Sequence, residues 1–289
     1  MNSFYFNEGA DALGDLACER YKADTALRGV DYKREVTPSG VWEKIKISSV
    51  EGAKSIGRPM GTYDTLELER MDLIDSESIE EARLEIAKNL TSLLGDMNII
   101  PKRLLIAGLG NASLTPDAVG SLAASKIKPT LHIKMSDERF FTTLECSEIA
   151  VIAPGVRATS GLDSVVIIRG ICDVIKPNAV IAIDSIAAGS TERLGTTIQI
   201  SNTGIVPGSG LGNTHHAINE ESVGAPVIAI GVPTVIDSRL FCRCEGEEEN
   251  GILRTGESMF VSPKEINEIV TVAAKIISGG INAAFGLYS

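Results

Sequence analysis

Histidine is scarce in this chain, with three among 289 residues, and basic residues are outnumbered by acidic ones, 27 to 38. So few histidines limit any site that depends on imidazole groups. The net charge of -11 argues against a general DNA- or RNA-binding surface, because neutralising phosphates requires clustered lysine and arginine. No stretch approaches the roughly 18 uninterrupted apolar residues of a membrane-spanning helix, and the N-terminus lacks the pattern of a secretory signal. A cytoplasmic location is therefore expected.

Cysteine is present in an odd number, five, without the regular spacing of a disulfide framework. Reduced thiols are therefore expected. Cys242 and Cys244 form a C-x-C pattern that suits a soft metal ion. Because no second pair and no adjacent histidine accompany them, we interpret this stretch as a solvated loop.

Apolar periodicity divides the chain into a polar N-terminal part and an ordered remainder. Residues 1–40 are polar, are broken by glycine and proline, and show no sustained period, which predicts a weakly structured arm or a propeptide. Ordered structure is expected from about Trp42, so that residues 41–289 form a single domain. "VWEKIKISSV" and "TYDTLELE" alternate like strands, and residues 76–97 have helical spacing.

Short apolar runs follow, of the kind found in strands buried on both faces: 103–109, 148–154, 179–185, 196–201 and 226–232. Helical stretches at 116–126 and 162–176 lie between several of them. A closing helix is expected after Ser262 as N-cap, with Pro263 at its first position. This alternation predicts an α/β fold with a mostly parallel open sheet and helices on both faces.

Open parallel sheets bind ligands beyond the carboxyl ends of their strands, so the residues that follow each apolar run are candidates for a site. Four such ends carry acidic, basic or glycine-rich stretches that are candidates for a functional site. They are "GNASLTPD" after 103–109, "PGVRATSG" after 148–154, Asp184 within 179–185, and "NTGIVPGSGLGNTHH" after 196–201.

The first of these stretches is not a standard nucleotide loop, because it lacks the third glycine of G-x-G-x-x-G and the G-K-[ST] of a phosphate-binding loop. Asp117 follows Pro116, and Thr115 is expected to cap a helix whose first turn contains Asp117. Asp117 then either complements the helix dipole or takes part in chemistry.

Asp184 is an acid at the end of a strand expected to be buried on both faces, where an unpaired carboxylate is costly. It is either hydrogen-bonded to backbone amides, a metal ligand, or half of a catalytic pair. If Asp117 faces Asp184, mutual repulsion raises one pKa and the pair shares one proton. One acid then activates water while the other protonates an amide leaving group.

The remaining candidates are assigned to substrate binding. They are Asn111 beside the Asp117 loop, Arg157 for an acidic group, and the backbone of Gly208, Ser209 and Gly210. The glycine-rich loop either approaches a substrate or is a set of tight turns, and Arg157 is otherwise a solvated loop residue. His215 and His216 are either surface residues or metal ligands. Serine hydrolysis is discarded because the chain has no G-x-S-x-G elbow followed by a histidine.

The blocks "GLGNASLTPDAVG", "VIAIDSIAAGSTERLGTTIQISNTGIVPGSGLGN" and "GAPVIAIGVPTVIDS" resemble the germination protease family of spore-forming bacteria over roughly residues 42–289. The resemblance implies an atypical aspartic endopeptidase whose two essential acids correspond to Asp117 and Asp184. It implies no cofactor, small acid-soluble spore proteins as substrates, a self-processed zymogen and a homotetramer. It also implies a fold similar to that of hydrogenase-maturation endopeptidases.

The processing segment of that family resembles T-D-L-A-x-E, and residues 23–28 read "ADTALR", which places processing at Lys22 and Ala23. Two alternatives stay open. One is a metal-dependent maturation peptidase that uses the two acids and a histidine, since the equivalent G-x-G-N loop of the hydrogenase-maturation endopeptidases carries an acidic metal ligand. The other is an inactive scaffold of the same fold.

Overall fold

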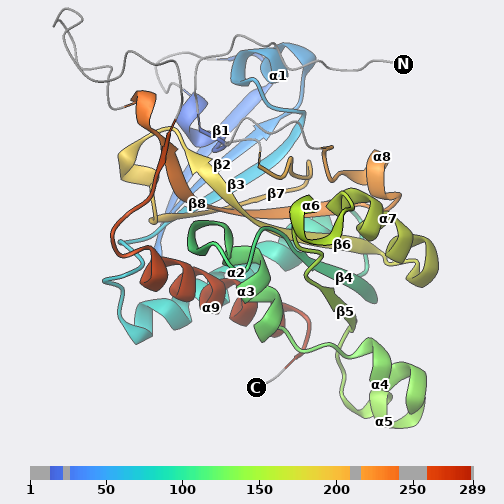
Figure 1. Ribbon diagram of the computed structural model, residues 1–289. Coiled ribbons are helices and arrows are strands. Elements are labelled where there is room, and N and C mark those ends of the chain that lie inside the picture. The colour runs from blue at the N-terminus through green and yellow to red at the C-terminus, as the bar shows by residue number, and fades with distance from the viewer. Residues whose placement is uncertain (1–13, 22–26, 209–215, 241–258, 288–289) are drawn as a thin grey trace, which may run out of the picture.

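The computed structural model describes residues 14–21, 27–208, 216–240 and 259–287. Within these ranges the chain forms one nine-stranded sheet flanked by helices (Figure 1). The strands are β1 (Val30–Thr37), β2 (Gly40–Ile47), β3 (Gly61–Glu67), β4 (Arg103–Gly108), β5 (Glu148–Ile152), β6 (Ala179–Ala188), β7 (Thr197–Ser201), β8 (Val227–Asp237) and β9 (Phe260–Val261). Every apolar run that the sequence assigned to a strand is a strand.

The sheet has the order β1-β2-β3-β7-β8-β6-β4-β5, with β9 paired to β8. Neighbours among β8, β6, β4 and β5 are parallel, whereas all other pairs are antiparallel. The α/β class is confirmed, and the sheet is mixed. Strand β7 runs against β8 because it follows β6 through a short connection that contains only the 3-10 turn η3 (Thr191–Arg193), too short for a parallel crossover.

The helices are α1 (Val50–Ile56), α2 (Ser76–Asp96), α3 (Val119–Lys126), α4 (Leu131–Ser136), α5 (Glu138–Thr143), α6 (Arg157–Ser160), α7 (Ser164–Ile175), α8 (Glu220–Val223) and α9 (Ile266–Ala284). Three further 3-10 turns are η1 (Cys18–Arg20), η2 (Thr115–Asp117) and η5 (Ser238–Leu240). The long predicted helix is α2, capped by the Asp75 side chain. In the described ranges no helix has the length and apolar character needed to cross a membrane.

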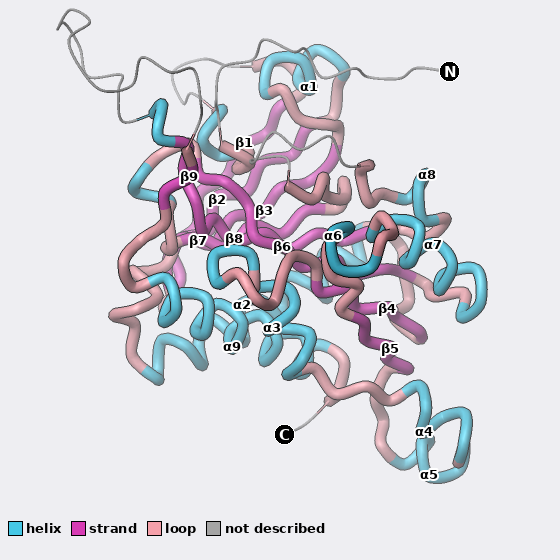
Figure 2. The backbone as a smooth tube through the Cα atoms, in the orientation of Figure 1, coloured by secondary structure: helices cyan, strands magenta, loops and turns pink. Residues whose placement is uncertain are grey.

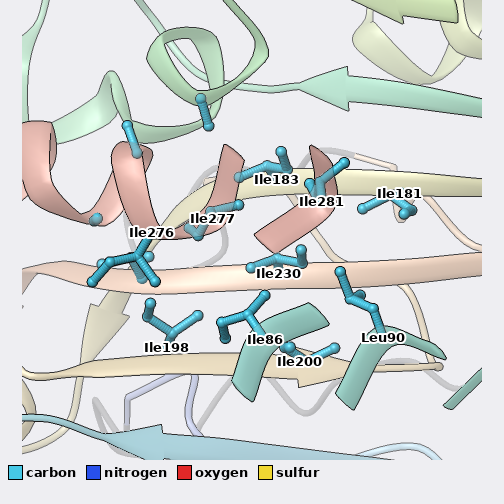
Figure 3. Packing of buried hydrophobic residues seen from close by; sticks show 14 of the residues in the cluster. Ile86, Leu90, Ile181, Ile183, Ile198, Ile200, Ile230, Ile276, Ile277 and Ile281 are labelled. Carbon is cyan, nitrogen blue, oxygen red and sulfur yellow. The ribbon is translucent and has the colours of Figure 1, made fainter. Parts of the chain in front are cut away.

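The two faces of the sheet are covered differently (Figure 2). Helices α2, α3 and α9 pack on one face and form the largest apolar core with the central strands. Figure 3 labels part of this core: Ile86 and Leu90 of α2, Ile181 and Ile183 of β6, Ile198 and Ile200 of β7, Ile230 of β8, and Ile276, Ile277 and Ile281 of α9. The other face has two smaller cores, one under α7 and α8 and one under α1 and residues 16–18. Asp184 belongs to this second face, because its neighbours Ile181 and Ile183 alternate onto the first.

The N-terminal part differs from the prediction of a weakly structured arm to residue 40. Strand β1 begins at Val30 and pairs along its whole length with β2, and Leu16 and Ala17 are completely buried. Strand β1 was not predicted from the sequence because it is a partly exposed edge strand with the polar sequence "VDYKREVT". Residues 14–21 lack periodicity because they follow no regular element except the short turn η1.

The last helix begins later than the sequence predicted. Its first residue is Ile266 and its N-cap is Glu265, which makes no side-chain capping bond. Ser262 and Pro263 therefore precede the helix rather than start it. The amide of Ile266 donates to the carbonyl of Pro263 at 3.3 Å, so a turn separates the expected cap from the helix.

Candidate active site

The site begins where β4 ends beside β6, which continues to Ala188, so Asp184 lies within β6 and not at its end as expected. Gly108, the last residue of β4, is in register with Ile183, and Asp184 follows in register with Gly231 of β8. The amide of Leu109 donates to the carbonyl of Ile183 at 2.8 Å. The loop after β4 therefore starts directly beside Asp184, at the edge where open α/β sheets bind ligands.

Asp184 is buried, with 2% of its surface exposed. Its Oδ1 accepts a hydrogen bond from the amide of Ser185 at 3.0 Å, whereas its Oδ2 has no hydrogen-bond partner among the described residues. Burial raises the pKa of Asp184 well above its usual value, and the negative charge of Asp117 raises it further. The surroundings of Asp184 thus favour its protonated form.

Asp117 is half-buried in the turn η2, and its Oδ2 accepts from the amide of Asn111 at 2.8 Å. Burial raises its pKa, an effect that this hydrogen bond opposes. Gly110 has a φ of 86°, and a Cβ there would lie 2.8 Å from Oδ1 of Asp117. The absence of a side chain at Gly110 therefore lets the acid fold back against its own loop.

The turn that carries Asp117 differs from the predicted helix start. Thr115 belongs to η2 and is not a helix cap; α3 begins only at Val119, and its N-cap, Ala118, makes no side-chain bond. The turn is held instead from β8, because the hydroxyl of the buried Thr234 donates to the carbonyl of Pro116 at 2.6 Å. Asp117 therefore lies in a separate turn before α3 and not in the first turn of that helix.

Two glycines bring helix α3 against the strand that bears Asp184. A Cβ on Gly108 would lie 2.1 Å from the carbonyl oxygen of Gly120, and a Cβ on Gly120 would lie 2.2 Å from that of Ile183. Both distances are far below any van der Waals contact. The backbones therefore touch, which places Asp117 close enough for its charge to act on Asp184.

Among the other predicted site residues, Asn111 contacts Asp117 through its backbone, whereas Arg157 and His216 contact Asp163. Asn111 supplies its backbone amide to Asp117, while its side-chain oxygen accepts from the amide of Ser113 at 3.0 Å. Arg157 forms an ion pair with Asp163 at 2.7 Å, and His216 lies 3.3 Å from the same carboxylate.

The glycine-rich loop does not start at the edge that bears the acids. Strand β7 is antiparallel to β8, and its last residue, Ser201, pairs with Ala229 near the beginning of β8. The expectation that all four strand ends share one edge is therefore wrong for β7. Gly208 lies in a turn with φ 65°.

Several predicted residues lie outside the described ranges: Lys22, Ala23, Ser209, Gly210, His215, Cys242 and Cys244. Among the residues that are described, no group of three or more histidine, cysteine or acidic side chains is arranged to hold a metal ion.

Sequence reasoning missed the segment Gly14–Arg20, which lies next to β6 just beyond Asp184. The amide of Asp15 donates to the carbonyl of Ala187 at 2.8 Å, and the Glu19 carboxylate accepts from the amides of Gly189 and Ser190. A signal was present, because residues 15–19 read "DLACE". They fit the pattern T-D-L-A-x-E more closely than residues 23–28 do.

Fold and site together define an α/β protein with a pair of interacting carboxyl groups at the ligand-binding edge of its sheet. A family model described as germination protease matches residues 11–242. The germination protease of Clostridium perfringens is 33% identical, covering 93% of this chain and 94% of its own length. That of Caldanaerobacter subterraneus subsp. tengcongensis is 35% identical with 93% of each chain covered, and that of Bacillus subtilis is 42% identical over 67% of this chain and 54% of its own.

This chain belongs to the germination protease family and is therefore a peptidase. Among solved structures, the [NiFe] hydrogenase maturation protease HycI from Thermococcus kodakarensis KOD1 aligns with a TM-score of 0.35 and 18% identity. That alignment covers 67% of this chain and 99% of HycI.

Proposed function

We propose that this chain is an endopeptidase that degrades small acid-soluble spore proteins during germination, with water activated by Asp117 and Asp184. The observation that supports this best is that the charge of a second acid, Asp117, acts on the buried Asp184, whose Oδ2 has no hydrogen-bond partner among the described residues. Buried polar atoms are normally paired, and the charge that acts most strongly on Asp184 is that of another carboxyl group. An acid pair with one shared proton instead suits hydrolysis of an amide.

The roles of the two acids follow from their surroundings. Asp184 is the more buried and holds the proton, so it donates to the carbonyl oxygen of the scissile peptide bond. Asp117 is the more exposed and accepts a proton from the attacking water as the new carbon–oxygen bond forms. When the tetrahedral intermediate breaks down, its hydroxyl returns a proton to Asp184 and Asp117 protonates the departing nitrogen. One water is consumed and both acids regain their starting states.

Processing, assembly and location belong to the same proposal. Residues 15–19 are the segment at which we expect self-cleavage of a zymogen, in place of Lys22 and Ala23, because only they carry the D-L-A-x-E pattern. The active form is a homotetramer in the spore cytoplasm that uses no metal ion.

The test is incubation of the purified chain with an acid-soluble spore extract, followed by mass spectrometry of the extract and of the chain itself. Defined fragments are expected with the wild type and none with Asp117→Asn. Asp173→Asn is the matched control, because Asp173 is an exposed acid on α7 that is expected to leave cleavage unchanged. Full activity of Asp117→Asn would refute the mechanism, and loss of activity with a chelator would favour the metal-dependent alternative.

A further inference from the structure

Helix α7 has one buried side and one exposed side that also carries apolar residues. Its Val165, Ile168 and Cys172 belong to the core formed with β4 and β6. On the opposite side, Val166 and Val174 are 57% and 81% exposed. A helix on the surface of a globular protein normally presents polar and charged residues to solvent. Exposed valines on one side depart from that pattern, which is typical of a contact with another molecule.

A glycine lies between the two valines. Val166, Gly170 and Val174 are spaced so that they form one ridge along the surface of the helix. Glycine inside a helix is less favourable than alanine, and it suits positions where another backbone approaches closely. Within the described residues, a Cβ on Gly170 would meet nothing within 4 Å. The described fold therefore gives no reason for a glycine at this position, whereas the close approach of another molecule does.

The ridge has the shape that receives a second α-helix. Ridges of residues spaced by four interdigitate when two helices cross at about −50°, which is the commonest packing of helices in globular proteins. Gly170 at the crossing point lets the two backbones approach, and the valines on either side of it then enter the grooves of the other helix. An identical helix carries an identical ridge, so a second copy of α7 related by a two-fold axis fits from both sides.

The charges beside the ridge favour such a copy over a partner of one charge sign. Arg169 and Asp173 lie on the same side of the ridge, and their exposed side chains pair at 3.2 Å. In two antiparallel helices that cross at Gly170, Arg169 of each copy lies beside Asp173 of the other. A strongly acidic or basic segment would instead meet a like charge at one of these residues. Exposed ion pairs contribute little affinity, so these charges orient the partner rather than hold it.

We propose that the outer side of α7 is a contact between two copies of this chain, which are arranged antiparallel about a two-fold axis near Gly170. Figure 1 shows α7 at the periphery of the molecule, beside α6 and α8. Leu162, between α6 and α7, is 52% exposed and extends the apolar surface. A stable contact buries about 800 Å² on each partner, so the ridge forms its centre and the surrounding polar residues its rim. The inference goes beyond the proposed function, which assigns no surface to assembly.

The first experiment measures the mass of the purified full chain by analytical ultracentrifugation over a range of concentrations. The wild type is expected to associate. Val174→Glu is expected to raise the dissociation constant roughly tenfold or more, because it buries a charge in an apolar contact. Ile100→Glu is the matched control, since Ile100 is an equally exposed apolar residue, at 81%, outside α7. A wild type that stays monomeric at every concentration, or equal effects of the two variants, overturns the proposal.

A mixing experiment tests whether the partner is a second copy in the antiparallel arrangement. In that arrangement Val166 of one copy lies against Val174 of the other. Val166→Lys and Val174→Glu should each weaken self-association, because each buries unpaired charges. An equimolar mixture of the two variants places the new lysine against the new glutamate, so association should recover by roughly tenfold relative to either variant alone. A mixture that associates no better than the separate variants overturns the arrangement.

Gly170→Leu tests the close crossing itself. Leucine is a better helix former than glycine, so this variant should fold and, as a separate chain, resist urea at least as well as the wild type. Its longer side chain would hold the two backbones apart, and association should weaken roughly tenfold or more. Association as strong as that of the wild type would show that no helix crosses at Gly170 and would overturn the proposal. These measurements need no substrate, so their outcome is independent of whether the acid pair cleaves spore proteins.

Discussion

Two buried carboxyl groups on the same sheet, Asp64 on β3 and Asp184 on β6, have different surroundings. Burial raises the pKa of both. Asp64 faces Asn89 of α2, whose amide nitrogen donates to its Oδ2 at 2.7 Å, and within the described part of the chain the remaining oxygens of Asp64 and Asn89 have no hydrogen-bond partners. One proton on Asp64 would let these two oxygens bond to each other. Asp184 instead is influenced by the charge of a second acid, Asp117. Burial alone therefore does not distinguish the two acids; the group that acts on each of them does.

The largest effect that separates the two acids is expected on activity. Asp184→Asn removes the proton that the proposed mechanism uses and should lower the rate of spore-protein cleavage by a factor on the order of 10³ or more. Asp64→Asn should leave that rate within about twofold, because Asp64 faces α2 on the opposite side of the sheet. Steady-state kinetics on one purified substrate measures both variants, with circular dichroism to verify folding. Equal losses in the two variants would remove the distinction.

A second effect concerns how Asp117 is held. Thr234→Val keeps the size of the buried side chain but removes the hydroxyl that donates to the carbonyl of Pro116. The turn that carries Asp117 then loosens, and kcat should fall roughly 10- to 100-fold with little change in KM, because small misplacements of a catalytic group are costly. Thr234→Ser retains the donor and should recover most of the rate. A Ser variant as slow as the Val variant would argue for packing instead.

A third effect concerns stability at Asp64. The folded-state pKa of this acid lies above that of the unfolded chain, so the stability it contributes is present at low pH and is lost as the pH rises through the folded-state value. Asp64→Asn supplies a permanent donor to Asn89 and should be more stable than wild type by about 1 kcal/mol at neutral pH. The advantage should shrink as the pH falls towards about 4, where the unfolded acid protonates. Urea unfolding at several pH values measures it.

The smallest effect is expected on the pH profile of catalysis. The negative charge of Asp15 helps to raise the pKa of Asp184, which must be protonated for the proposed reaction. The rate of self-cleavage should therefore decline as the pH rises through that pKa, and Asp15→Asn should move the decline to lower pH. A pH profile of the self-cleavage rate, followed by mass spectrometry of the chain, detects the shift while residue 15 is still attached. A decline that moves to higher pH would contradict the assigned role of Asp184.

The sequence predicted the position of a residue well where that position depended only on the strand that contains or precedes it. Asp117 and Asp184 were selected as candidates because Asp117 follows one apolar run and Asp184 lies near the end of another, and parallel pairing places the end of β4 beside Asp184, although β6 continues to Ala188. The direction of β7 was not predictable in the same way, since "TTIQIS" has the composition of a buried strand in either orientation. Its direction depends on the short connection after β6, and the glycine-rich loop consequently starts from the other edge.

The segment Gly14–Arg20 was missed for another physical reason. Its bonds to Ala187, Gly189 and Gln199 join residues more than 150 positions apart, and no local period reflects such contacts. Strand β1 was missed because an exposed edge strand needs no apolar alternation. The segment Gly14–Arg20 is thus held by residues distant in sequence, whereas β1 is held by its pairing with the adjacent strand β2.

The contact between Gly108 and Gly120 means that the position of Asp117 relative to Asp184 depends on residues without functional groups. A single methyl group at either position would press on backbone oxygen and force α3 away from β6, although both acids would remain in the chain. A relative that retains the two aspartates but carries alanine at one of these glycines is therefore expected to be inert. Distinguishing active from inactive members among such relatives therefore requires the identities of residues 108 and 120 as well as those of the two acids.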